Sequence, residues 1–239
     1  MVKTLLIYKS KYKATKESVK KLAKILGPAR CIECNEFDKD CEKYDFYVMV
    51  SPIYYEEIDK ELKDFLVKKK DFFKNKKVAA LSFSMSDGFY DRYLKIYKDI
   101  LGDSLVYYNN FGSVINVEKL DKTDYESLEK FYEKMSMPLK DKDTRDDLKL
   151  ALSGLEIKRI KDDLELKCKR KDILYEVEDY LRRHNTCTLC TASSIGVRGT
   201  PIEYNYFNKS LYFISEGGEK FANILLNKNV SVTLYDNYV

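Results

Sequence analysis

A turn rich in hydroxyl and lysine side chains, close to the N-terminus, carries the residues best suited to chemistry. Its members are Ser10, Lys11, Tyr12, Lys13, Ala14 and Thr15. Hydroxyl donors and ammonium groups close together in a turn are typical of sites that bind phosphate or another anion. The other interpretation is an ordinary connection between two secondary-structure elements, and the turn by itself does not decide between them.

Two predicted elements position this turn. Leu5, Leu6 and Ile7 form a short apolar run that predicts a buried strand. After the turn, apolar residues recur at helical spacing over 19–26, and Gly27 and Pro28 end the predicted helix. In a strand–turn–helix unit the backbone N–H groups of the turn and the positive end of the helix dipole favour a bound phosphate.

Strands and helices continue to alternate over residues 1–153. The predicted strands cover 29–34, 46–50, 78–83 and 105–108, and the predicted helices cover 58–66, 93–101 and 125–135. This alternation predicts an α/β fold with a doubly wound parallel sheet. Ligands of such sheets bind beyond the carboxyl ends of the strands. We therefore expect the turn at 10–15 and the loops at 51–57 and 82–88 to form one site.

Three stretches give this region a family resemblance. The stretch from Tyr8 to Lys16 resembles the phosphate-binding loop of flavodoxins, in particular the flavodoxin-like family that includes bacterial protoporphyrinogen oxidase. Ser51-Pro52-Ile53-Tyr54 looks like the motif that lies against the isoalloxazine ring in that family. Phe111-Gly112, Ile115-Asn116 and Leu120 are similar to the stretch after the family's fifth strand. The resemblance covers about residues 1–150.

The resemblance implies FMN as cofactor and a flavodoxin-like domain over 1–153. Ser10, Lys11 and Thr15 would bind the phosphate within the turn formed with Tyr12, Lys13 and Ala14. Pro52 would stiffen the second loop, next to Ile53, and Tyr54 would stack on the ring. Ser82, Ser84 and Ser86 would lie near the ring. The implied function is an FMN-dependent oxidoreductase or electron-transfer flavoprotein.

Two residues depart from the family pattern. Lys13 and Glu56 stand where the family usually has glycine. A carboxylate at position 56 would oppose the anionic reduced flavin. These replacements favour an alternative function, in which the chain keeps the flavodoxin fold without FMN and acts as a binding or interaction module.

A last helix of the first domain is predicted through Leu148 and Leu152, and Gly154 is expected to end it. A second domain is predicted over 171–239, after a linker or hairpin over 154–170. Short strands at 187–192, 199–204, 211–215 and 229–234 are typical of an all-β unit. Thr200-Pro201-Ile202, Leu211 to Ser215 and Gly218-x-Lys220 resemble the N-terminal part of the pyridoxamine 5′-phosphate oxidase-like split barrel, an FMN-binding family. The resemblance implies that Arg198 and Lys220 bind phosphate, that Ser215 donates a hydrogen bond nearby, and that the protein is a homodimer. The alternative is that these are turn residues of a β-domain.

Composition excludes several classes of protein. The chain has 239 residues and a formal net charge of +4, with both signs of charge interspersed, which argues against a nucleic-acid partner. No apolar run approaches a membrane span and no signal peptide is visible, so we expect a cytoplasmic protein. Three residues apart on a predicted strand, Cys187 and Cys190 would face opposite sides, and we expect no metal site. The expected partner is a redox protein or a small-molecule substrate.

Overall fold

The computed structural model describes residues 2–86, 88–165 and 170–235. The chain forms two compact units, Met1–Glu165 and Leu166–Val239. Each unit is described here by itself. Residues 166–169 of the predicted linker or hairpin lie outside the described residues.

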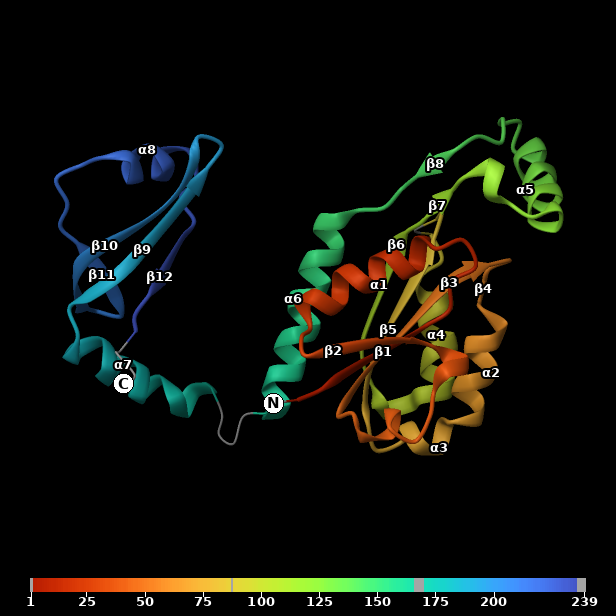
Figure 1. Ribbon diagram of the computed structural model, residues 1–239, viewed down its shortest axis with the longest axis horizontal. Coiled ribbons are helices and arrows are strands. Elements are labelled where there is room, and N and C mark those ends of the chain that lie inside the picture. Colours follow the sequence, from red (N-terminus) through yellow and green to blue (C-terminus); the bar gives the residue numbers. More distant parts are fainter. Residues whose placement is uncertain (1, 87, 166–169, 236–239) are drawn as a thin grey trace. The chain divides into compact units, whose positions relative to one another are not determined.

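The first unit is built on a parallel sheet, as the alternation of elements predicts (Figure 1). Its strands lie in the order β2-β1-β3-β5-β6. They are β1 (Thr4–Tyr8), β2 (Ala29–Glu33), β3 (Phe46–Tyr54), β5 (Lys77–Ser84) and β6 (Leu105–Gly112). The short strand β4 (Glu57–Ile58) turns back and pairs antiparallel with the end of β3. Because β1, β3 and β5 are parallel neighbours in this sheet, their carboxyl ends lie next to one another.

Helices cover both faces of this sheet because its central strands are apolar on both sides. Along β1, Leu5 and Ile7 pack on the side of α2 (Lys60–Lys68), α3 (Lys70–Phe73) and α4 (Tyr90–Leu101). Leu6 and Tyr8 pack on the opposite side, under α1 (Ala14–Ile25) and α6 (Asp147–Glu165). Short 3₁₀ turns η1 (Cys34–Glu36), η2 (Cys41–Lys43) and η3 (Gly102–Ser104) complete the connections.

An excursion of the chain follows β6 before α6 begins. It consists of β7 (Val114–Ile115), η4 (Val117–Lys119), α5 (Lys122–Lys134) and β8 (Lys142–Asp143), and β7 pairs antiparallel with β8. None of the side chains of α5 is buried, so this helix does not belong to the core. Figure 1 shows the excursion at one end of the sheet.

Of the two alternatives predicted for 154–170, a linker or a hairpin, the hairpin is wrong over 154–165, because these residues continue the helix α6. Gly154, expected to end that helix, lies inside it and faces α1. A Cβ atom at Gly154 would lie 2.9 Å from Ile25 Cδ1 and 3.0 Å from Leu22 Cδ1. The glycine therefore permits close packing of two helices instead of ending one of them.

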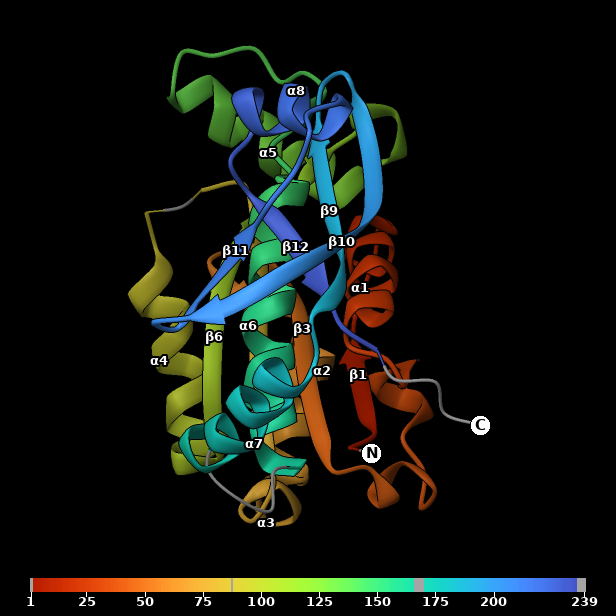
Figure 2. The same ribbon diagram turned by 90° about the vertical axis from the view of Figure 1, so that its left-hand side faces the viewer.

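The second unit is an antiparallel sheet with the strand order β11-β10-β9-β12. Its elements are α7 (Arg170–Arg183), β9 (Thr186–Ser193), β10 (Gly196–Phe207), β11 (Ser210–Phe213), α8 (Glu219–Leu226) and β12 (Val230–Thr233). Tyr204 on β10 donates a hydrogen bond to the Leu181 carbonyl of α7 at 3.0 Å, and Asn223 of α8 donates to Thr191 on β9 at 3.3 Å. Figure 2 shows this sheet and α8. An α/β sheet followed by an antiparallel half-barrel sheet confirms the predicted fold class.

Candidate functional site

The turn between β1 and α1 has the shape of an anion-binding turn. Lys13 precedes α1 with φ 68°, in the left-handed region that glycine adopts most readily. No side chain caps the helix at this residue. The Ser10 hydroxyl accepts a hydrogen bond from the backbone N–H of Lys16 at 3.3 Å, and Thr15 is buried in the first helical turn. The N-terminus of α1 supplies N–H groups that can bind an anion.

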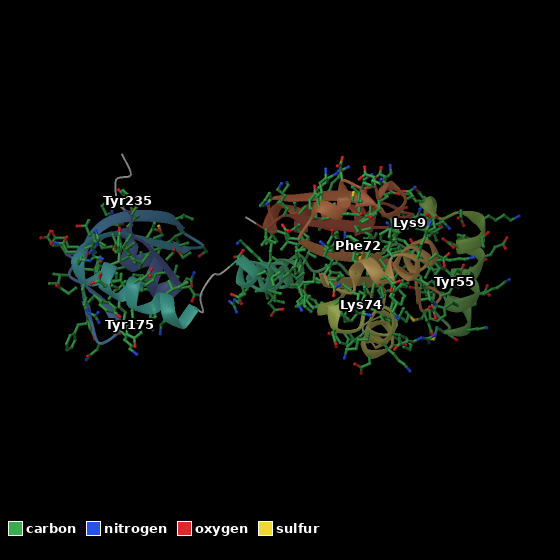
Figure 3. The ribbon with its side chains drawn as sticks, turned by 90° about the horizontal axis from the view of Figure 1, so that it is seen from below. Lys9, Tyr55, Phe72, Lys74, Tyr175 and Tyr235 are labelled. Carbon is green, nitrogen blue, oxygen red and sulfur yellow. The ribbon has the colours of Figure 1, made fainter. Side chains whose placement is uncertain are left out.

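Carboxylates at the start of α5, on its N-cap residue Asp121 and on Asp124, hold the side chains of this turn. The Lys11 ammonium lies 2.6 Å from Asp121 and 2.7 Å from Asp124. Tyr12 donates its hydroxyl proton to Asp124, and Tyr55, beside α5 in Figure 3, donates to Asp124 at 3.2 Å. Burial by itself would raise the pKa of Asp124, but hydrogen bonds from Lys11 and Tyr12 outweigh it and keep this pKa below its ordinary value.

A cavity of about 470 Å³ opens beyond the carboxyl ends of β3 and β5, a volume typical of small-molecule sites. Its walls include six aromatic side chains: Tyr12, Tyr54, Tyr55, Phe89, Tyr93 and Phe131. Tyr12 and Tyr54 meet edge to face with ring centroids 6.4 Å apart. Burial raises the pKa of the Tyr54 phenol, so this ring is neutral at ordinary pH. Walls of this kind suit a flat aromatic ligand.

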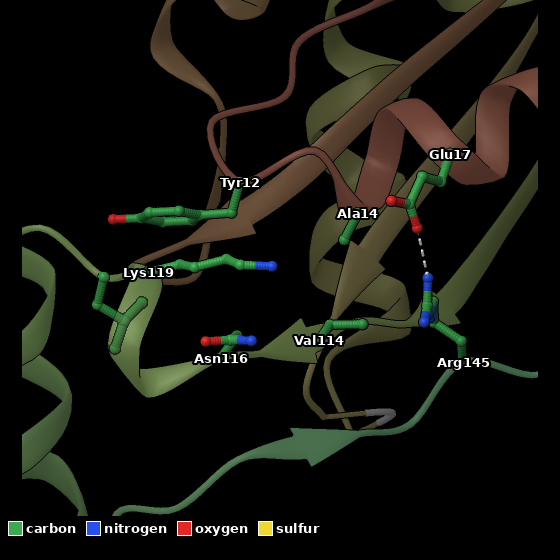
Figure 4. A pocket seen from close by; sticks show the side chains of 8 residues that line it. Tyr12, Ala14, Glu17, Val114, Asn116, Lys119 and Arg145 are labelled. Atoms are coloured by element: carbon green, nitrogen blue, oxygen red, sulfur yellow. Dashed lines mark hydrogen bonds and ion pairs between the residues drawn. The ribbon is translucent and has the colours of Figure 1, made fainter.

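A smaller cavity of about 230 Å³ adjoins the first, and the two share Tyr12, Val114 and Leu120. Figure 4 shows Tyr12 and Asn116 toward one end of it and Glu17 with Arg145 toward the other. The Arg145 guanidinium lies 2.9 Å from Glu17 and 2.6 Å from Asp143, so carboxylates compensate its charge.

Most of the predicted residues of the first unit lie at these cavities. Tyr12, Ala14, Pro52, Ile53, Tyr54, Ser84 and Ser86 line one or both of them. Ser82 lines neither cavity, because it is buried in β5, where its hydroxyl accepts a hydrogen bond from Tyr108 at 3.1 Å. Ser10, Lys11, Lys13 and Thr15 lie in the turn itself.

The predicted residues of the second unit are described within that unit alone. Arg198 pairs with Glu219, and Lys220 donates to the carbonyl of Gly217. Ser215 lies two residues beyond the end of β11.

Glu56 is not an uncompensated charge. Its carboxylate pairs with Arg92 of α4, and the neighbouring Glu57 lies 3.0 Å from the Lys63 ammonium. The opposition to a reduced flavin that the sequence suggests at position 56 is therefore reduced by an adjacent cation.

Sequence reasoning missed the walls that the excursion supplies. Asp124, Ser127, Leu128 and Phe131 of α5 line the larger cavity, and Lys119 and Arg145 line the smaller one. The apolar spacing of α5 gave no signal of a site, because it is also the spacing of a core helix. For three other lining residues, Ile115, Asn116 and Leu120, the sequence did offer a signal of a site. They lie in the stretch that is similar to the one after the fifth strand of the flavodoxin-like family.

Two kinds of feature are absent from the part of the chain that the structure describes. It holds no group of three or more His, Cys, Asp or Glu side chains arranged to bind a metal. Among the same residues, no helix combines the length and the apolar character that crossing a bilayer requires.

Solved structures similar to this chain include several flavodoxins and flavoproteins. A flavoprotein in complex with FMN from Lactobacillus acidophilus NCFM has 17% identity and a TM-score of 0.39, over 46% of this chain and 93% of that chain. The two-electron reduced flavodoxin of Megasphaera elsdenii has 16% identity and a TM-score of 0.39, over 45% and 84%. A WrbA-like flavodoxin from Agrobacterium tumefaciens has 14% identity and a TM-score of 0.45, over 68% and 96%.

Comparison with curated proteins finds no match. The family model of the flavodoxin domain matches residues 5–147, which is more than half of the chain. The chain therefore belongs to the flavodoxin domain family.

Proposed function

We propose that residues 1–165 bind FMN and that the protein is an FMN-dependent oxidoreductase or electron-transfer flavoprotein. The observation that carries this proposal is the aromatic-walled cavity of about 470 Å³ beside the β1–α1 turn. Members of the flavodoxin family and similar solved structures bind FMN, which supports the same assignment.

The side chains present fit the two ends of FMN. Tyr54 and Pro52 offer a flat aromatic surface and a stiff turn for the ring, and Ser84 and Ser86 offer polar groups at its edge. Ser10, Lys11 and Thr15 belong to the turn in front of α1, where backbone N–H groups and the helix dipole favour a phosphate. When bound, FMN supplies the redox chemistry, and the protein contributes binding, orientation and exclusion of water.

A flavin titration tests the proposal. We expect purified protein, or stripped protein given FMN, to show a flavin spectrum and to quench flavin fluorescence. Tyr54→Ala should weaken binding at least about tenfold, since a ring stack is worth about 1 kcal/mol beyond its buried area. Tyr125→Ala is the matched control, because Tyr125 lies on α5, outside the cavity walls, and donates to Glu129. Wild-type protein that binds no flavin would contradict the proposal and favour the interaction-module alternative.

The split-barrel assignment of residues 171–239 is a further part of the proposal. It includes a phosphate-binding role for Arg198, Ser215 and Lys220. The Thr15→Val variant separates the two candidate sites, because a flavin spectrum that this variant leaves unchanged would favour the second unit.

We propose that the second unit also forms a homodimer. Val197, Ile214 and Leu225 are 83%, 85% and 84% exposed, so this unit leaves aliphatic surface that a second copy of the chain could cover. Ile214→Glu should shift the protein to monomer in sedimentation experiments, and a wild-type monomer would contradict this part. A cytoplasmic location and a redox protein or small-molecule partner, with no nucleic acid, complete the proposal.

A further inference from the structure

A residue that lines the smaller cavity, Asn116, has a buried side-chain oxygen that accepts no hydrogen bond from the described residues. A buried acceptor left in this state destabilises a protein, and folded proteins seldom contain one. A ligand hydroxyl group would satisfy it. Because a hydroxyl both donates and accepts, it can pair with either end of the amide.

Lys119 contributes a cation to the same cavity. Its ammonium has no ion pair or hydrogen bond within the described ranges, 2–86, 88–165 and 170–235. The neighbouring cations differ, because Lys11 is held by two carboxylates of α5, and Arg145 by Glu17 and Asp143. Lys119 can thus meet an anionic ligand without first leaving a carboxylate partner, whereas Lys11 and Arg145 each have such partners.

The position of the smaller cavity fits an elongated ligand. It adjoins the aromatic cavity through Tyr12, Val114 and Leu120, and Ala14 and Glu17 from the first turn of α1 line it as well. A molecule with its ring in the larger cavity and an anionic end near α1 would therefore pass beside Asn116 (Figure 4).

We infer that the smaller cavity binds the polyhydroxylated, phosphorylated arm of the flavin. Asn116 pairs with a hydroxyl group of this arm, and Lys119 pairs with its phosphate. The inference rests on the proposed function and deepens it, because it assigns the arm to the excursion after β6 in addition to the β1–α1 turn.

Three flavins separate the contributions in a fluorescence titration. FMN carries the hydroxyls and the phosphate, riboflavin carries the hydroxyls alone, and lumiflavin carries neither. We expect Asn116→Leu to weaken FMN and riboflavin about tenfold, which is the loss of one hydrogen bond of about 1.4 kcal/mol, and to leave lumiflavin unchanged. We expect Lys119→Met to weaken FMN about tenfold and to leave riboflavin and lumiflavin unchanged.

Two controls accompany these variants. Lys130→Met removes the same charge from an exposed residue of α5 that lines neither cavity, and it should leave all three affinities unchanged. Asn116→Asp keeps the acceptor, so its riboflavin affinity should return to the wild-type value even if Asn116→Leu folds poorly.

The outcomes are distinct. Unchanged FMN and riboflavin affinities in Asn116→Leu would overturn the inference for Asn116, as would a weakened riboflavin affinity in Asn116→Asp. If Lys119→Met loses no more FMN affinity than Lys130→Met, the inference for Lys119 is overturned. If wild-type protein binds none of the three flavins, the proposed function itself fails. Binding of all three with equal affinity would instead retain a ring site and refute the arm site.

Discussion

Gly112, at the end of β6, allows the excursion to return to the sheet, and we predict that a single methyl group there disrupts the site. A Cβ atom at Gly112 would lie 1.7 Å from the Thr144 carbonyl oxygen and 2.8 Å from the Thr144 hydroxyl. The carbonyl belongs to the backbone and cannot rotate out of the way as a flexible side chain can. Gly112→Ala must therefore separate the end of β6 from the segment that follows β8.

The cost follows from the contacts that this separation breaks. The backbone N–H of Thr144 donates to the Ser113 carbonyl at 3.0 Å, and the backbone N–H of Ser113 donates to the Thr144 hydroxyl at 3.0 Å. The Thr144 hydroxyl in turn donates to the Ser113 carbonyl at 3.1 Å. Three hydrogen bonds at about 1 kcal/mol each amount to about 3 kcal/mol of unfolding free energy. At about 2–4 °C per kcal/mol, the melting temperature should fall by about 6–12 °C.

Thermal and urea unfolding, followed by circular dichroism, measure this loss. Gly88→Ala is the matched control, because the nearest atom to its new Cβ would be Ser86 Oγ at 3.6 Å, an ordinary contact. Flavin affinity should fall in Gly112→Ala as well, since Ser113 and Val114 line the larger cavity. A melting temperature for Gly112→Ala within about 2 °C of Gly88→Ala would refute the reasoning.

Three other predictions concern charge and backbone conformation. Lys161 is buried, and its ammonium donates to two carbonyl groups at the C-terminal end of α1, at 2.7 and 2.9 Å. Lys161→Ala should therefore lower the unfolding free energy by about 2–4 kcal/mol in urea titrations. The surface variant Lys158→Met should lower it by less than about 1 kcal/mol. Burial alone would raise the pKa of Asp124, but hydrogen bonds from Lys11 and Tyr12 outweigh burial and hold this pKa low. The ionised Asp124 carboxylate therefore stabilises the folded protein above about pH 4, and this stabilisation is lost as pH falls through the lowered pKa. The stability difference between wild type and Asp124→Asn should therefore shrink from about pH 6 to about pH 3, and a constant difference would contradict the assignment. Lys13 has φ 68°, a left-handed conformation that is costly for a β-branched residue and free of strain for glycine. Lys13→Ile should therefore lower the unfolding free energy by about 1–2 kcal/mol, and Lys13→Gly should not lower it. Equal melting temperatures for the two variants would count against the left-handed turn.

The sequence predicted the parallel sheet well because that sheet has a strong local signature. Val48, Met49 and Val50 are buried on both sides of β3, and such a strand needs an uninterrupted apolar run. The same local reasoning failed at Gly154. Whether a glycine ends a helix or permits contact with another helix depends on α1, more than a hundred residues earlier in the chain.

The site was predicted in the loops that follow strands and missed in the excursion. Pro52 and Tyr54 carry a local motif, and the topology rule places them at the edge where ligands bind. Asp124 has no such motif, and its importance arises only when folding brings it to Lys11, across 113 residues of chain. Ser82 is a different case: its place near the end of a strand suggested a ligand contact, and in the structure its buried hydroxyl pairs with Tyr108.

The two replaced glycines bear on whether the fold keeps its cofactor. Lys13 and Glu56 have φ values of 68° and 61°, so the backbone retains at both positions a conformation that glycine would adopt freely. Each costs on the order of 1 kcal/mol, which is small against a typical stability of about 5–15 kcal/mol. Both side chains are exposed, and the Glu56 carboxylate pairs with Arg92. Because an anion at the β1–α1 turn would be bound chiefly by backbone N–H groups, whose directions depend on φ and ψ, the replacements alone are weak support for a domain that has lost FMN.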